Sequence, residues 1–312
     1  MIATLSGLVL RAIVVLSGTA FLTFALLWNA PGDPAQAIAM ARFDALLSED
    51  VIAQVREEAG LNRNFWAAFW DWVGPLMMLD FGNSSVTGRP VWPDLWTSIS
   101  YTFPLAIVSL GVGLAVSLPL AILATRRPGG WVDRCAVAIA SIGTAIPAFW
   151  LGLLLILLFA VHLAWLPAMG ARTPAHAILP AMTLGLGVAA SLTRIIRSGI
   201  LEARNQPFLP AIQRRGVTPH AIGRDHIAPH AAVPVVTVLG LELAFLLEGL
   251  VMVEVIFGRP GLGTFLVSAI SARDFPHVQA VVVVAAVVFV TVNLLIDVIY
   301  KLIDPRIAAR DA

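Results

Sequence analysis

A long cluster of ionisable side chains and helix-breaking residues lies in residues 198–234, between two strongly apolar segments, and we call it the charged loop. Seven of the ionisable side chains fall between Leu209 and Pro234: Arg214, Arg215, His220, Arg224, Asp225, His226 and His230. A bilayer core does not tolerate such charge, yet the apolar runs on either side, Ala177 to Ile196 and Val235 to Phe257, are long enough to cross one. The pattern indicates a membrane protein with a charged, structured cytoplasmic loop.

The loop is expected to fold as helix, turn and helix. Gly216 can adopt the left-handed conformation that ends one helix, and Thr218 followed by Pro219 is typical of a helix N-cap and first turn. A short helix is therefore predicted from about Pro219 to His226. Two interpretations stay open on composition alone: docking onto a soluble partner, or an ordinary basic loop that obeys the positive-inside rule.

Motifs for bond-making chemistry are missing from the sequence. A phosphate loop needs Gly-Lys-Ser or Gly-Lys-Thr, and the only lysine, Lys301, stands in Tyr-Lys-Leu. HExxH, GxSxG and Cys-His metal spacings do not occur either. ATP hydrolysis by this chain is excluded, whereas intramembrane proteolysis stays open because it needs only a Ser-His pair or paired Asp at depth.

The other candidate functional residues are acidic side chains inside an apolar span. Glu242, Glu248 and Glu254 recur every six residues. On a helix this spacing separates successive side chains by about 120°, so the three do not share one face. Carboxylates in a membrane usually face protein or water. We expect Glu242 or Glu248 to face a solute pathway, with interhelical hydrogen bonding as the alternative, and Glu254 to lie near the outer surface.

Composition places the whole chain among membrane proteins. Of 312 residues, 59% are hydrophobic and 12% charged, and the net charge of +1 indicates no nucleic-acid partner. The single cysteine, Cys135, allows no internal disulfide and no thiolate metal cluster. His162, His176 and His277 lie near the predicted outer face, but their spacing defines no metal site.

An all-α fold with six transmembrane helices is predicted. The expected spans are Leu8–Trp28, Ile99–Thr125, Cys135–Leu163 with a kink at Pro147, Ala177–Ile196, Val235–Phe257 and Val278–Tyr300. Thirteen of the twenty Lys and Arg then lie on the cytoplasmic side, which favours both termini inside. The predicted organisation is a first helix and its exit (1–34), a periplasmic helical segment (35–97) and a five-helix core (98–312).

The periplasmic segment should contain an amphipathic helix. It starts at Asn64, carries Phe65, Trp66, Phe69, Trp70 and Val73 on one face, and ends at Gly74-Pro75. An aromatic face of this kind is more typical of contact with the membrane or a partner subunit than of ligand binding.

The charged loop resembles the signature of ABC-importer permeases. Gly216 stands at the signature glycine, His226 at the isoleucine position, and Ala228-Pro229 at Leu-Pro, while Pro210-Ala211-Ile212 replaces the opening Glu-Ala-Ala. The run RDHIAPHAAVPVVTVLG is similar to the dipeptide/oligopeptide/nickel branch. So are Gly32-Asp-Pro34, GLNRNFWAAFWDW, LDFGNSSVTGRPV, Trp165 to Gly170 and VEVIFGRPGLG.

The resemblance implies a non-catalytic subunit of the bacterial inner membrane. Its expected partners are a homologous second permease, two ATPase subunits that hold ATP and Mg, a periplasmic solute-binding protein and the lipid bilayer; the chain itself is expected to bind no cofactor and no metal. The loop would be the coupling element, with ten implied residues: Arg214, Arg215, Gly216, Thr218, Pro219, His220, Arg224, Asp225, His226 and Pro229.

Two questions remain open at the level of sequence. The solute could be a peptide, nickel, a metal chelate or a glutathione-like molecule. The alternative function is a secondary transporter or channel driven by an ion gradient through Glu242, Glu248 or Asp297.

Overall fold

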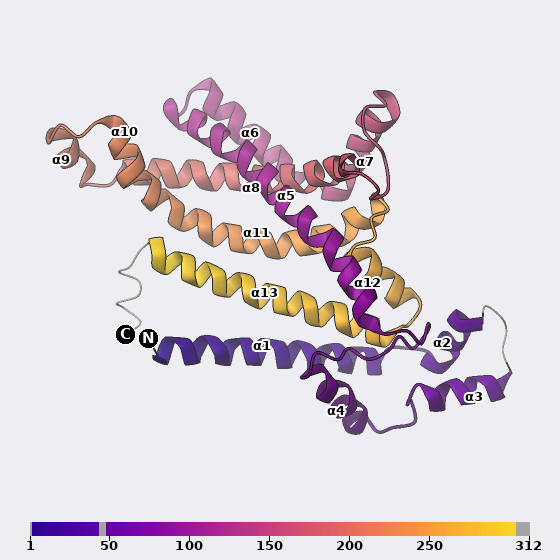
Figure 1. Ribbon diagram of the computed structural model, residues 1–312. Coiled ribbons are helices and arrows are strands. Elements are labelled where there is room, and N and C mark those ends of the chain that lie inside the picture. The colour runs from indigo at the N-terminus through magenta and orange to yellow at the C-terminus, as the bar shows by residue number, and fades with distance from the viewer. Residues whose placement is uncertain (1, 44–47, 304–312) are drawn as a thin grey trace. The chain divides into compact units, whose positions relative to one another are not determined.

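The chain is helical throughout the part that the computed structural model describes, residues 2–43 and 48–303 (Figure 1). An isolated antiparallel bridge between Asn83 and Pro90 is the only β pairing in those residues. The α-helices are α1 (Ile2–Trp28), α2 (Pro34–Phe43), α3 (Glu49–Glu58), α4 (Phe65–Leu76), α5 (Val91–Arg126), α6 (Trp131–Ala145), α7 (Ala148–Leu155), α8 (Ile178–Arg204), α9 (Leu209–Arg214), α10 (Pro219–Ile222), α11 (Ala228–Ile256), α12 (Leu262–Ser271) and α13 (Phe275–Ile303). Two π-helical turns, η1 (Ile156–His162) and η3 (Gly223–Ile227), and a 3₁₀ turn, η2 (Pro174–Ala177), complete the order.

Within residues 2–43 and 48–303, five helical segments are long and apolar enough to cross a bilayer, and the bent pair α6 and α7 makes a sixth if it is counted as one span. The all-α membrane fold predicted from the sequence is therefore confirmed. The predicted cytoplasmic C-terminal segment after Ile303 lies outside the described residues.

Several helices extend beyond the predicted spans. α5 starts at Val91 rather than Ile99, α8 continues to Arg204, and α11 starts at Ala228 rather than Val235. Pro93 fits the first turn of α5 because no intrahelical N–H bond is needed there. With 36 residues, α5 is about 54 Å long, more than the ~30 Å hydrocarbon core, so part of it lies outside the bilayer.

The kink predicted at Pro147 is a full break, with α6 and α7 bent by 102°. Ile146 is extended (φ −81°, ψ 122°), as expected for a residue before proline, and α7 starts directly after Pro147. The α12 helix is a further element that no predicted span included.

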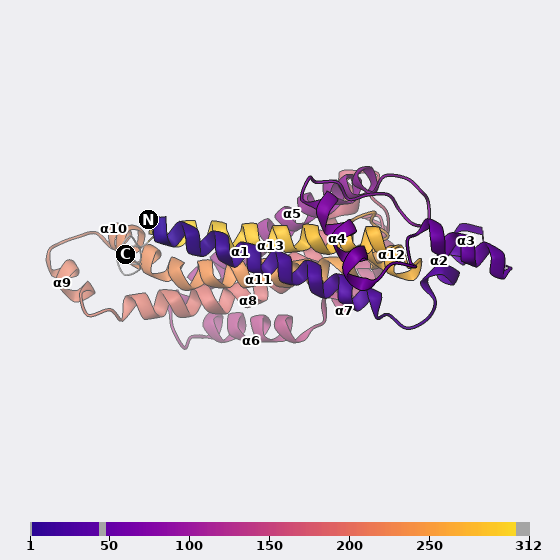
Figure 2. The same cartoon turned by 90° about the horizontal axis from the view of Figure 1, so that it is seen from below.

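Two compact units make up the chain: Met1–Thr102 with Pro260–Val290, and Phe103–Arg259 with Thr291–Ala312. The core of the second unit centres on α8, which packs against α6, α7 and α11. Both views show α8 and α11 side by side (Figures 1 and 2).

Small residues allow the close packing of this second unit. A Cβ added at Gly185 of α8 would come within 2.7 Å of the Ser109 carbonyl oxygen, and one added at Gly113 of α5 within 2.6 Å of the Val188 side chain. Such close approach is how membrane helices gain van der Waals contact without a hydrophobic driving force between them.

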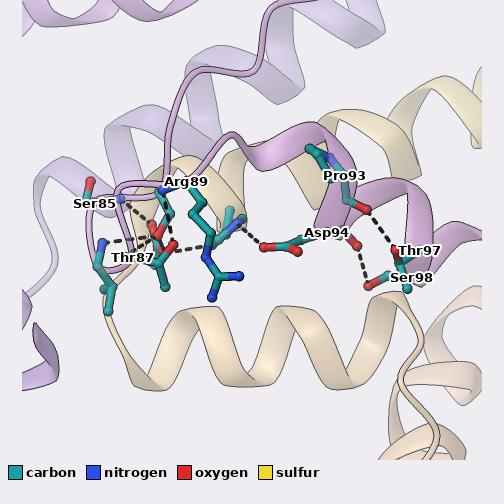
Figure 3. Close-up of polar contacts among 11 residues, drawn as sticks. Ser85, Thr87, Arg89, Pro93, Asp94, Thr97 and Ser98 are labelled. Carbon is teal, nitrogen blue, oxygen red and sulfur yellow. Dashed lines mark hydrogen bonds and ion pairs between the residues drawn. The ribbon is translucent and has the colours of Figure 1, made fainter.

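The first unit contains a buried polar cluster around Asp274, in the turn between α12 and α13. Its carboxylate accepts hydrogen bonds from the Ser84 hydroxyl, from the Ser85 backbone N–H at 3.0 Å and from His277 Nδ1 at 2.6 Å. Figure 3 shows Ser85, Thr87 and Arg89 beside this cluster and Asp94 at the start of α5; the Asp94 carboxylate lies 3.8 Å from His277 Nε2. The cluster joins the 84–90 loop, α5 and α13.

The Asp274 cluster predicts a specific pH dependence. Burial alone raises the pKa of Asp274, but hydrogen bonds from His277 and Ser84 outweigh it and hold the pKa below its usual value. A lowered folded-state pKa stabilises the fold fully above the unfolded value of about 3.9 and is lost as the pH falls through the folded value. Asp274→Asn should therefore lower stability at pH 7 by about 1 to 3 kcal/mol, and the difference should shrink below about pH 4.

Thermal unfolding of the purified chain in detergent, followed by tryptophan fluorescence between pH 7 and pH 3, measures this difference. Asp80→Asn, an exposed aspartate of the same unit, is the control. A gap between wild type and Asp274→Asn that stays constant down to pH 3 would contradict the role of the Asp274 charge.

Candidate functional site

The charged loop has the local structure that its sequence predicts. Gly216 has a φ of +76°, and the Thr218 hydroxyl accepts a hydrogen bond from the Ala221 backbone N–H at 3.3 Å. Pro219 occupies the first turn of α10. The short helix predicted from Pro219 to His226 divides into α10 and the π turn η3, which leads directly into α11.

Apolar and aromatic contacts hold the two ends of the loop together. Leu209 and Ile222 are buried. The Phe208 ring lies 5.2 Å from the His230 ring and 6.5 Å from the His226 ring, which joins the chain after α8 to the beginning of α11. His226 and His230 thus take part in the packing of the loop.

Most of the polar side chains on the loop point outward. Arg214, Arg215, His220, Arg224, Asp225 and Pro229 are all exposed, as are Gly216, Thr218 and Pro219. Arg224 and Asp225 pair through two hydrogen bonds of 2.6 and 3.0 Å and so neutralise each other. Among the described residues Arg214 and Arg215 make no ion pair, so the end of α9 presents two adjacent positive charges.

The helix that leads into the loop is tied to the turn between α5 and α6. Arg197 of α8 forms a bidentate ion pair with Asp133, whose side chain is only 3% exposed, and Asp133 also accepts the Gly129 backbone N–H at 2.8 Å. Arg204 donates a hydrogen bond to the Thr125 carbonyl oxygen. The sequence alone did not predict these contacts. A single acid, Asp133, within the basic segment from Arg126 to Arg134 is the one feature that could have indicated an ion pair there.

A cavity of about 860 Å³ lies between the end of α8 and the beginning of α11. Its lining includes Gly199, Glu202, Gln206, Phe208 and His230. A Cβ at Gly199 would approach the Ala231 carbonyl oxygen to 3.2 Å, so the helices are in close contact directly beside the cavity.

The three glutamates of α11 differ in their surroundings. Glu242 is half-buried, and Glu254 is completely buried. Glu248 belongs to α11, but its side chain lies outside the described residues. The structure therefore does not bring the two pathway candidates together in a described site, and Glu254 is part of the packed interior.

The histidines predicted near the outer face do not gather. His176 bonds to Thr173, His162 Nδ1 lies 3.0 Å from the Leu157 carbonyl oxygen, and His277 belongs to the Asp274 cluster. In the described part of the chain, no group of three or more His, Cys, Asp or Glu side chains could hold a metal ion.

Residues 117–309 match the model of the family described as "Binding-protein-dependent transport system inner membrane component". This match covers α8, the charged loop and α11. The chain belongs to this permease family. Membership confirms the ABC-importer permease predicted from the loop and makes the chain a multi-pass protein of the inner membrane.

Named relatives resemble this permease over nearly its whole length. A probable peptide ABC transporter permease of Sinorhizobium fredii, y4tP, is 35% identical over 303 residues, covering 95% of this chain and 96% of the relative. The glutathione transport system permease GsiC of Salmonella choleraesuis is 36% identical over 303 residues, covering 97% and 96%.

A solved structure supports the fold of the permease core. The inward-facing MetNI methionine ABC transporter, in its selenomethionine-soaked crystal form, superposes with a TM-score of 0.58. The match covers 68% of this chain and 96% of that chain at 21% identity.

The ion pair beneath the loop predicts a large stability effect. Asp133→Ala leaves the Arg197 charge unpaired and should lower stability by about 3 kcal/mol. The double variant Asp133→Leu with Arg197→Met should recover much of the loss, because no unpaired charge remains. Thermal unfolding in detergent measures both.

Arg134→Ala, an exposed arginine one residue from Asp133, is the matched control and should change stability by no more than about 0.5 kcal/mol. Equal melting temperatures for Asp133→Ala and Arg134→Ala would contradict the buried ion pair.

Proposed function

We propose that this permease forms one half of the pathway through which an ABC importer takes up small peptides or peptide-like solutes of the glutathione type. The observation that carries the proposal is the end-to-end identity of 35–36% with permeases named for peptide and glutathione transport. Nickel and metal chelates, the other solutes considered from the sequence, have no such relative among those described above. The secondary-transporter alternative is not supported by membership of a binding-protein-dependent family.

The proposal includes partners that do the chemistry. A second, homologous permease would complete the pathway, a periplasmic binding protein would deliver solute, and two ATPase subunits would bind ATP with Mg and hydrolyse it. The chain itself would form part of the pathway, transmit the motion of the ATPase subunits and bind no cofactor. Both termini and the charged loop would face the cytoplasm, in keeping with the excess of Lys and Arg on that side.

The charged loop is proposed to be the element that docks onto an ATPase subunit. Its exposed surface carries Arg214 and Arg215 on α9, and a capped helix starting at Thr218. The Phe208 ring contacts His230 at the start of α11, and Arg197 of α8 pairs with Asp133. These contacts would transmit a displacement of the loop to α8 and α11. Alternating access would follow when ATP closes the ATPase pair.

Identifying the solute is the direct test of substrate class. The partner binding protein, purified from cells without denaturation, should carry a peptide or a thiol tripeptide that mass spectrometry detects. Recovery of nickel or a metal chelate in its place would overturn the peptide assignment and leave the permease assignment intact.

Charge reversal tests the docking role. Arg214→Glu with Arg215→Glu should reduce uptake and solute-stimulated ATP hydrolysis about tenfold or more, because like charges at an interface cost several kcal/mol. Insertion of the chain should be unchanged, as measured by its amount in membranes. Normal uptake by this variant would count against the loop as the docking element.

Arg126→Glu with Arg127→Glu is the matched control, because it removes an equally exposed arginine pair from the predicted cytoplasmic side. Uptake should persist in the control. An equal loss of uptake in both variants would indicate an effect on topology and would contradict the docking interpretation.

The pathway glutamates have their own test. Glu242→Gln or Glu248→Gln should lower uptake about tenfold, the effect of losing one charge-assisted hydrogen bond of about 1.4 kcal/mol. Glu57→Gln, on an exposed surface of α3, is the control. Normal transport by both Glu242→Gln and Glu248→Gln would remove them from the pathway.

A further inference from the structure

α4 crosses α1 close to the end of that membrane-spanning helix. Three residues on successive turns of α4, Phe65, Phe69 and Trp72, all contact Phe24, with ring centroids 5.3, 5.4 and 5.8 Å apart. Phe24 precedes the last residue of α1, Trp28, by four residues, or about 6 Å along the helix axis. The crossing therefore fixes α4 at the depth where the apolar part of α1 ends.

A neighbouring side of α4 and the turn that follows it present exposed apolar side chains, which we call the α4 surface: Trp66, Trp70, Met77, Met78 and Leu79. The last three are 82%, 86% and 78% exposed, and the two tryptophans are also exposed. An exposed apolar patch of this kind marks a contact with a membrane or another protein. Arg63 and Asp71 form the ion pair beside it, which gives α4 a polar side as well.

Leu79 is held in a backbone conformation that leucine disfavours. Its φ is +61°, and the turn is closed by hydrogen bonds from Leu79 N–H to the Leu76 carbonyl at 2.9 Å and from Asp80 N–H to the Pro75 carbonyl at 3.1 Å. Glycine usually occupies this position at a helix end because a side chain is strained there. A leucine that is both strained and exposed indicates that its side chain has a contact outside the described chain.

Continuity with α1 identifies that contact as lipid. The Trp66 ring stacks on Phe21 of α1 at 6.1 Å, and Leu22 and Leu26 of α1 are exposed on a helix that crosses the bilayer. The α4 surface therefore continues an exposed apolar surface of a helix that is long and apolar enough to cross a bilayer. Tryptophan is enriched at this depth, because its ring is apolar and its N–H reaches the polar layer.

We infer that α4 and residues 77–79 form an interfacial anchor, with the α4 surface embedded in the bilayer leaflet at the Trp28 end of α1. An interfacial helix of this type buries its apolar side about 5–10 Å into the boundary between head groups and acyl chains. The anchor fixes the base of the segment between α1 and α5 relative to the membrane. On the proposed topology this is the outer leaflet; the inference itself holds for either orientation.

Site-directed fluorescence tests the anchor in the complete transporter, reconstituted in lipid nanodiscs. The single cysteine is first removed as Cys135→Ser, and Met78→Cys is then labelled with an environment-sensitive NBD dye. Nanodiscs containing phospholipid with a nitroxide high on the acyl chain should quench the dye at least about twofold, and aqueous iodide should not. Ala53→Cys on α3, an exposed control site, should show the reverse.

Two results would overturn the inference. Quenching at position 78 by iodide but not by spin-labelled lipid would place the surface in water. Protection from both quenchers would place a protein partner on it. Neither result bears on the proposed transport function, whose tests concern the solute and the charged loop.

A second variant separates anchoring from folding. Leu79→Gly removes the strained side chain, so the melting temperature in detergent should stay the same or rise. The lipid quenching at position 78 should nevertheless weaken. An unchanged quenching ratio would show that Leu79 does not contribute to the anchor.

Discussion

The close contact between α8 and α11 is the interaction on which the second unit depends. Lipid offers no hydrophobic drive for two apolar helices to associate, so they must touch closely, and glycine allows this at Gly199 beside Ala231 and at Gly249 beside Leu184. The charged loop connects these two helices, since it follows from α8 and leads into α11. Any change in their contact therefore moves both ends of the loop, and any force on the loop is applied to that contact.

In the proposed docking role, the charged loop would transmit force from the ATPase subunit to α8 and α11. Its ends are joined by the Phe208 and His230 rings, and α8 is bound to the α5–α6 turn through Arg197 and Arg204. A π turn such as η3 is a rare element that marks functional positions in helices, and here it separates the capped helix α10 from α11.

The features that sequence predicted best are those decided by local backbone chemistry. Gly216 needs a positive φ, Thr218 and Asn64 cap helices, and each behaves as expected. Gly74-Pro75 was expected to end α4, but the helix continues to Leu76, because a proline near a helix end disturbs few hydrogen bonds. Family resemblance supplied the proposed role of the loop, which composition alone had left open.

The features that sequence missed depend on contacts between distant residues. Asp133 and Arg197 are 64 positions apart, and Ser84 and Asp274 are 190 apart, so no local pattern joins them. The 102° break at Pro147 exceeds an ordinary proline kink because the extended Ile146 also leaves the helical conformation. The aromatic face predicted for α4 divides in the structure, with Phe65 and Phe69 against α1 and Trp66 and Trp70 largely exposed.

Cross-linking from a single cysteine on α10 tests the central claim, that the charged loop faces the cytoplasm and contacts an ATPase subunit. His220→Cys in the Cys135→Ser background carries an exposed thiol on that helix. In inverted membrane vesicles a short bifunctional reagent should join it to the ATPase subunit, with a yield that changes when ATP is added. Labelling of the same cysteine by a membrane-impermeant maleimide at the periplasmic face of intact spheroplasts, without any cross-link to the ATPase, would contradict the account.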